Sequence, residues 1–125
     1  MRTMLKSKIH RARITSVNLD YAGSIALDKK LMLEADILPH EQVHILNVNN
    51  GQRFTTYAIE GRNGEVGLNG AAARLAQKND IVIILTYSQI GDDEARSLMP
   101  KLVYVDEKNS IARTSRAIGA LSLGD

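Results

Sequence analysis

The chain has 125 residues, 44% of them hydrophobic and 24% charged, with a formal net charge of +2. This is the composition of one globular domain, and the balanced charge does not favour nucleic acid or a membrane surface as a partner. The lack of cysteine excludes disulfides and cysteine metal sites, and the three histidines form no HExxH-type metal motif. Arg2, Lys6 and Lys8 interrupt the N-terminal segment, which lacks the apolar core of a signal peptide. We expect a single cytoplasmic domain over residues 1–125, without a bound metal.

The apolar patterning predicts a mainly β protein. In chain order, we expect strands at residues 9–15, 24–28, 43–48, 53–60, 65–69, 81–90 and 102–107. Strict alternation in the first strand places Ile9, Arg11 and Arg13 on one face. Asn50-Gly51 predicts a hairpin between the third and fourth strands, because this pair tolerates positive φ.

Short helices are expected between some of these strands. Each predicted helix follows a residue whose side chain can cap it: 29–36 after Asp28, 70–77 after Asn69 and 93–99 after Asp92. Many short strands with a few short helices favour a closed or nearly closed β-barrel over a doubly wound sheet. The segment 109–125 has weak patterning, so we expect it to be partly mobile.

The dipeptide Gly23-Ser24, directly before a predicted strand, admits two interpretations. It can be an ordinary turn, which is what such a dipeptide on its own favours. It can also be a bond that the protein cleaves in itself, because a serine hydroxyl can attack the carbonyl of the preceding glycine. The amide then becomes an ester, elimination cuts the chain, and hydrolysis leaves a pyruvoyl group at residue 24.

The strand RFTTYAIE, residues 53–60, carries two side chains suited to an anionic ligand. Alternation puts Arg53 and Tyr57 on one face and Thr56 on the other. Arg53 offers a bidentate fork to a carboxylate, and Tyr57 offers a hydroxyl that can donate a proton. Read alone, the same pattern also fits a solvated arginine and a tyrosine at a barrel edge.

Two other motifs can contribute to an anion site. Lys8 and His10 share one face of the first predicted strand. In NGAAAR, residues 69–74, small side chains leave the first backbone N–H groups of a predicted helix open to a ligand. Each motif alone fits a polar strand face or an alanine-rich helix start equally well or better.

Together, these motifs resemble the bacterial aspartate 1-decarboxylase family. The resemblance extends from Met1 to about Glu107 and rests on five blocks in order: RTMLKSKIHRARIT, LDYAGSIALD, NVNNGQRFTTYAI, LNGAAARLA and NDIVIIL. It implies a double-psi β-barrel, a homotetramer with active sites between subunits, and synthesis of β-alanine from L-aspartate for pantothenate and coenzyme A. It also implies a proenzyme that cleaves itself into residues 1–23 and 24–125, with a pyruvoyl cofactor formed from Ser24. The resemblance does not say whether a maturation factor is needed.

The resemblance also implies roles for single residues. Lys8 and Arg53 match basic residues around the substrate carboxylates, and Tyr57 matches the proton donor. The substrate contacts match Thr56 and the backbone of Gly70, Ala71 and Ala72. Positions near the cleaved bond or pocket match Gly23, Tyr21, His10, Thr56 and Asn69. Alternation separates Thr56 from Tyr57, so either the strand is irregular or the two residues serve different parts of an inter-subunit site.

The chemistry of the implied reaction requires an electron sink. Loss of CO₂ from an amino acid leaves a carbanion, which a Schiff base to a cofactor carbonyl can stabilise. The sequence shows no phosphate cradle for pyridoxal phosphate, whereas a pyruvoyl group needs no bound molecule. Two alternatives are a small DNA-binding barrel using Arg11, Arg13 and Arg53, and a ligand-binding barrel that never matures.

Overall fold

The protein is described by a computed structural model, which places residues 1–116. Its strands form one nine-stranded mixed sheet in the order β2-β6-β3-β5-β4-β7-β1-β8-β9. The strands are β1 (Arg2–Arg13), β2 (Ser16–Asn18), β3 (Ser24–Asp28), β4 (Gln42–Asn47), β5 (Arg53–Gly61), β6 (Val66–Asn69), β7 (Ile81–Ile90), β8 (Lys101–Val105) and β9 (Ile111–Ser115). The helices are α1 (Lys29–Glu34), the 3₁₀ helix η1 (Gly70–Leu75) and α2 (Asp92–Ser97). The prediction of a mainly β fold with short helices is confirmed.

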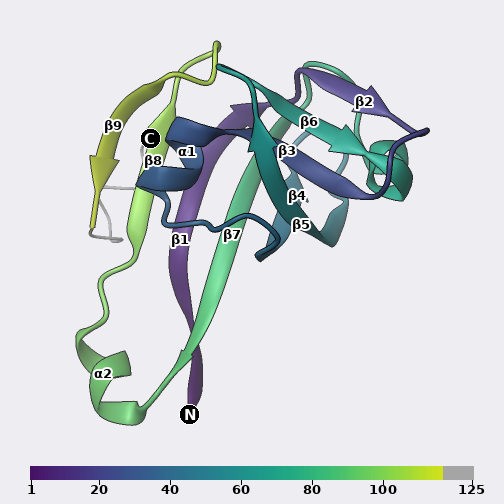
Figure 1. Ribbon diagram of the computed structural model, residues 1–125. Coiled ribbons are helices and arrows are strands. Elements are labelled where there is room, and N and C mark those ends of the chain that lie inside the picture. The colour runs from purple at the N-terminus through teal and green to yellow at the C-terminus, as the bar shows by residue number, and fades with distance from the viewer. Residues whose placement is uncertain (117–125) are drawn as a thin grey trace.

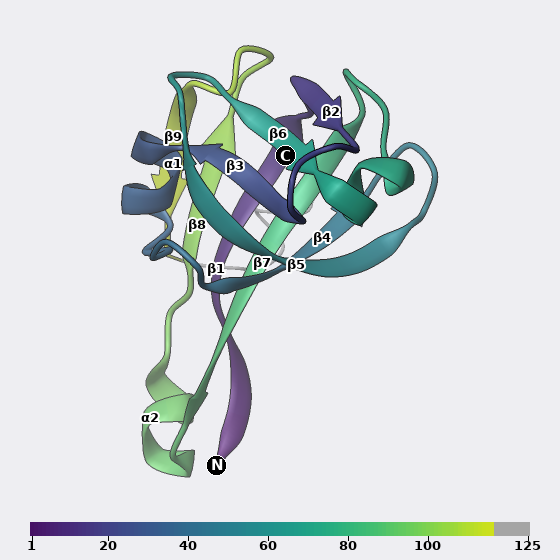
Figure 2. The same cartoon turned by 45° about the vertical axis from the view of Figure 1, so that its right-hand side comes forward.

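The sheet curls around one apolar core (Figures 1 and 2). Ile9, Ile25, Ile45, Leu68 and Ile84 are almost fully buried there, although they come from five different strands. A sheet that curls in this way buries one face and leaves the other outside, as in a small β-barrel. The double-psi crossing of the barrel stays a prediction.

The first strand departs from the strict alternation that the sequence predicted. Ile9 and Ala12 are both completely buried, so Ile9, Arg11 and Arg13 do not share a face. The β1–β7 register shifts between Ile9 and Ala12, and Arg11 has a φ of +64°. A β-bulge therefore inserts an extra residue and turns Arg11 outward while apolar contacts continue on both sides.

The structure has some of the predicted turns and helix caps and lacks others. β4 and β5 form the predicted antiparallel hairpin, in which Gly51 has a φ of +77°. Asp28 caps α1 by accepting a hydrogen bond from the Lys30 backbone at 2.8 Å. The predicted capping by Asn69 is wrong, because its side chain makes no bond to η1 and turns to Ser24 instead. Asp92 lies inside the first turn of α2, and Gly91 is the N-cap.

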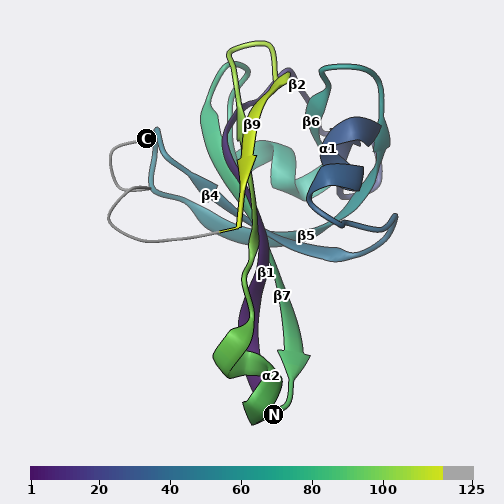
Figure 3. The ribbon, with the colours of Figure 1, turned by 90° about the vertical axis from the view of Figure 1, so that its left-hand side faces the viewer.

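A two-stranded arm extends from the barrel. It consists of the first half of β1 and the second half of β7, and α2 lies at its far end (Figures 1 and 3). Regular structure also reaches into the weakly patterned C-terminal segment, because residues 111–115 pair with β8 as β9. Residues 117–125, the rest of the segment predicted to be mobile, lie outside the described residues. Among residues 1–116, no helix is long and apolar enough to cross a membrane.

Candidate active site

Ser24 is the first residue of β3 and is only 3% exposed. The Asn69 side-chain amide donates a hydrogen bond to Ser24 Oγ at 3.1 Å. The hydroxyl in turn points to the Ala22 carbonyl, 3.5 Å away, on the backbone just before the Gly23-Ser24 bond. The side chain of Ser24 is thus held against the backbone of residues 21–24, which we call the cleavage segment because the sequence resemblance predicts cleavage within it.

Gly70 packs directly against this cleavage segment. Its φ is +68°, and a Cβ built there would lie 2.6 Å from both the Cα and the backbone nitrogen of Gly23. It would also lie 2.9 Å from the Tyr21 carbonyl oxygen. Real Cβ atoms do not approach backbone so closely, and the backbone conformation itself favours glycine. The first residue of η1 therefore fixes the position of the cleavage segment by contact.

The sheet register sets three of the predicted site residues in one row. Ser24 pairs with Asn69 on β6, and the next residue, Ile25, pairs with Ala58 on β5. Continuing the parallel register by one residue sets Tyr57 beside Ser24, so Asn69, Ser24 and Tyr57 follow one another across β6, β3 and β5. We call this the serine row. Because Ile25 and Ala58 face the core, the serine row belongs to the outer face of the sheet.

Thr56 lies on the other face of β5. The β4–β5 register has no irregularity, and Thr56 pairs with the core residue Val43, whereas Tyr57 is 38% exposed. An irregular strand therefore does not explain why the resemblance assigns roles to both Thr56 and Tyr57. Of the backbone positions assigned to substrate contact, Gly70 is buried, Ala71 is exposed and Ala72 is half-buried in the first turn of η1.

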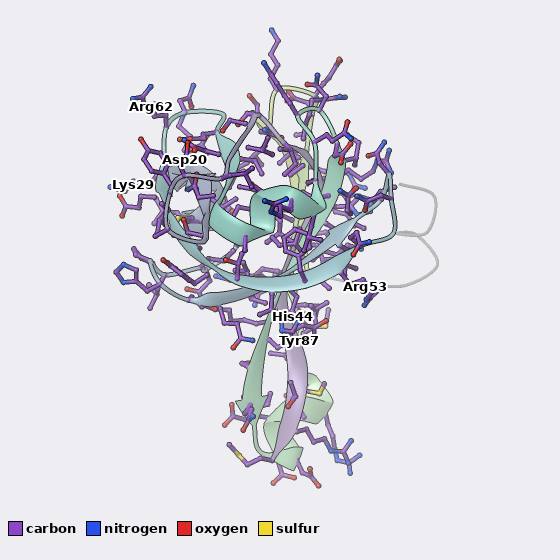
Figure 4. The ribbon with its side chains drawn as sticks, turned by 90° about the vertical axis from the view of Figure 1, so that its right-hand side faces the viewer. Asp20, Lys29, His44, Arg53, Arg62 and Tyr87 are labelled. Carbon is purple, nitrogen blue, oxygen red and sulfur yellow. The ribbon has the colours of Figure 1, made fainter. Side chains whose placement is uncertain are left out.

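A second group of predicted site residues lies on the outer face of β1, β7, β4 and β5. Lys8 pairs with Leu85, Leu85 with His44, and His44 with Thr55, so the four side chains share one row. Arg53 is two residues from Thr55 and therefore projects from the same face. We call Lys8, His44 and Arg53 the cationic face. Figure 4 shows His44 beside Tyr87 and Arg53 further along β5.

His10 lies on β1 two residues after Lys8, and it is distant in the sheet order from the serine row. Its ring packs edge-on against Tyr104 of β8, with centroids 5.5 Å apart, and the Arg113 guanidinium covers the same tyrosine at 3.9 Å. In the sheet order, β5, β4 and β7 separate β1 from β3. The structure thus groups Tyr21, Gly23, Ser24, Tyr57, Asn69 and Gly70, but it places Lys8 and His10 elsewhere in the same chain.

Sequence reasoning missed His44, although a signal was available. In VHILNV, residues 43–48, His44 alternates with the apolar residues Val43 and Ile45, which marks it as an outer-face residue. Its approach to Arg53 and Tyr87 depends on the register of three strands, which the sequence does not give. Among residues 1–116, no group of three or more His, Asp or Glu side chains is arranged to hold a metal ion.

Comparison with known proteins adds the family context. Residues 1–112 match the family model described as aspartate decarboxylase. The chain is 57% identical to an aspartate 1-decarboxylase of Thermoanaerobacter pseudethanolicus, over 86% of this chain and 94% of the relative. It is 55% identical to one of Caulobacter vibrioides, over 90% of this chain and 98% of the relative. An aspartate 1-decarboxylase of Dehalococcoides mccartyi is 52% identical, over 96% of this chain and 98% of the relative.

Proposed function

The chain belongs to the aspartate decarboxylase family, and on that premise we propose that it converts L-aspartate into β-alanine and CO₂ with a pyruvoyl group made from its own Ser24. The observation that carries this proposal is the buried Ser24, whose hydroxyl accepts a hydrogen bond from Asn69 and whose neighbour Gly23 packs against Gly70. An ordinary turn serine needs neither burial nor a side-chain amide on its hydroxyl. We further propose that the protein acts in the cytoplasm and supplies β-alanine for pantothenate and coenzyme A synthesis.

The self-cleavage proceeds through the Ser24 hydroxyl. Ser24 Oγ attacks the Gly23 carbonyl carbon, the C–N bond breaks, and the nitrogen takes the hydroxyl proton, which leaves an ester. Loss of the Cα proton of residue 24 then expels the Gly23 carboxylate, and water replaces the nitrogen as ammonia leaves. The contacts around the bond fit this mechanism. The Asn69 side-chain amide donates a hydrogen bond to Ser24 Oγ, and Gly70 packs directly against the backbone of Gly23. The products are residues 1–23 and residues 24–125, the latter beginning with the pyruvoyl group.

The remaining site residues bind the substrate and move one proton. The pyruvoyl carbonyl supplies the electron sink for the carbon that loses CO₂, a task that no standard side chain performs. Arg53 and Lys8 hold carboxylates, and the backbone at Gly70, Ala71 and Ala72, together with Thr56, contacts the substrate. Tyr57, beside Ser24 in the serine row and partly exposed, delivers a proton to the carbon.

The complete site requires two subunits. Three strands separate Ser24 from Lys8 within one chain, and the side chains of Lys8 and Arg53 project outward. A neighbouring subunit can bring its Lys8 and Arg53 against the serine row, as in a symmetric homotetramer. This arrangement also accounts for Thr56 and Tyr57, which face opposite sides of β5 and so serve different parts of the assembled site.

The direct test follows the chain and its product together. After incubation, intact mass measurement should find two chains divided between Gly23 and Ser24, and L-aspartate should yield β-alanine. Ser24→Ala should abolish both, whereas Ser97→Ala, at an exposed position of α2, should abolish neither. β-Alanine formation by Ser24→Ala would contradict the pyruvoyl mechanism. A native chain that binds aspartate but stays whole would instead support the ligand-binding barrel that never matures.

A further inference from the structure

His44 occupies the centre of the cationic face. It lies on β4 between Leu85 and Thr55, and Leu85 in turn separates it from Lys8. Two strand spacings, about 10 Å, therefore separate the backbones of His44 and Lys8, and the long lysine stem can span much of that gap. Arg53 is the diagonal neighbour of His44 across the β4–β5 pair, within reach of its long side chain.

Two cavities meet at His44. A cavity of about 490 Å³ is lined by Thr3, Gln42, His44, Tyr87, Ser88 and Gln89. A smaller one of about 130 Å³ lies between His44, Arg53 and Tyr87. Among residues 1–116, no Asp or Glu lines either cavity. The Arg53 guanidinium therefore has no carboxylate beside it in the cavity that it lines.

The three side chains of the cationic face have no polar partner among the described residues. Within residues 1–116, no hydrogen bond or ion pair involves the Lys8 ammonium, the His44 ring or the Arg53 guanidinium. Two other cations in β1 are paired, since Arg2 meets Asp92 at 2.8 Å and Lys6 meets Glu41 at 2.6 Å. The His44 ring is also held in place, because it packs edge-on against Tyr87 with centroids 5.0 Å apart (Figure 4).

We propose that His44 is a carboxylate-binding residue that makes the cationic face selective for dicarboxylates. An imidazole N–H donates to a carboxylate oxygen, and the bond strengthens when the ring is protonated. Lys8, His44 and Arg53 then offer three donors at separate points, enough to hold two carboxylates at once. A monocarboxylate can accept hydrogen bonds from only some of these three side chains. The inference rests on the proposed function, because it concerns the substrate-binding half of that site.

The test compares two inhibitors on the cleaved, assembled enzyme. Succinate carries two carboxylates and propionate one, and neither has an amine to react with the pyruvoyl group. His44→Gln should raise the inhibition constant of succinate about tenfold, the effect expected for one lost charge-assisted bond, and leave that of propionate within about twofold. The KM for L-aspartate should rise in parallel with the succinate constant, while kcat stays within about twofold.

Three variants separate carboxylate binding from a structural role. His44→Lys places a cationic N–H donor at this position and should return the succinate constant close to the native value. Ser97→Ala, at an exposed position of α2 that lines neither cavity, should leave both inhibition constants unchanged. If His44→Gln fails to assemble, His44→Thr replaces it, because a β-branched residue suits a strand.

Each outcome bears on the inference. Equal losses of succinate and propionate binding, or no loss of either in an active variant, would overturn the role of His44 while leaving the proposed function intact. Failure of His44→Lys to restore succinate binding would show that charge is not the cause. A native protein that cleaves but makes no β-alanine would overturn the proposed function and, with it, this inference.

Discussion

The cleavage segment and the cationic face differ in the contacts that they make within one chain. Ser24 is buried, its hydroxyl accepts a bond from Asn69, and Gly70 presses against Gly23. The side chains of Lys8, His44 and Arg53 project outward without a polar partner in the described part of the chain. Under the proposed function, this contrast predicts that self-cleavage needs the contacts of one chain only, whereas substrate binding needs a neighbouring subunit.

The substitution Gly70→Ala tests whether the contact with Gly70 positions the cleavage segment. A methyl group 2.6 Å from the Gly23 backbone must push the scissile carbonyl away from Ser24 Oγ. We expect cleavage to slow by at least about 100-fold, as is typical when reacting groups are displaced by about 1 Å. Intact mass over a time course measures the rate.

Gly51→Ala is the matched control for Gly70→Ala. Gly51 has a similar φ of +77°, but a Cβ there meets nothing within 4 Å. Gly51→Ala should therefore lose about 1 kcal/mol of stability from backbone strain and keep cleavage, whereas Gly70→Ala adds the clash with Gly23 to the same strain and should lose more stability and slow cleavage. Equal cleavage rates in the two variants would show that the contact with Gly23 does not position the bond.

Tyr57→Phe separates cleavage from turnover. The change removes one hydroxyl at the exposed end of the serine row and keeps the ring. We expect normal formation of the two chains but a kcat lower by about 100-fold or more, the usual cost of losing a general acid. Intact mass and β-alanine production report the two steps separately. Unchanged turnover would remove Tyr57 as the proton donor.

The sequence predicted the elements of this fold better than their contacts. β3 and β7 have the bounds predicted for them, because both are apolar runs with clear breaks on either side. The bulge at Arg11 was not predictable, since it depends on how β1 pairs with β7. Asn69 is at the start of η1 as expected, but its side chain bonds to Ser24 and not to the helix backbone.

The candidate site was predictable residue by residue only through the family resemblance. Composition and spacing alone left Gly23-Ser24 as a turn and Arg53 as a solvated side chain. What the sequence could not give is the grouping of these residues, which follows from strand register over separations of 30 residues or more. For the same reason, His44 became visible as a neighbour of Arg53 only in the folded chain.

Mixing two inactive variants tests whether the two regions meet across a subunit boundary. Ser24→Ala lacks the cofactor precursor but keeps the cationic face, whereas Lys8→Ala keeps the serine row but lacks one cation. If each active site combines the serine row of one subunit with Lys8 of another, random assembly of equal amounts restores about a quarter of the sites. Coexpressed and purified as a mixed assembly, the pair should therefore regain about a quarter of native β-alanine production. A site built within one chain cannot be repaired in this way, since every chain in the mixture carries a defect. Activity no higher than that of Lys8→Ala alone would place the whole site in a single subunit, and the outward direction of Lys8 would then need another explanation.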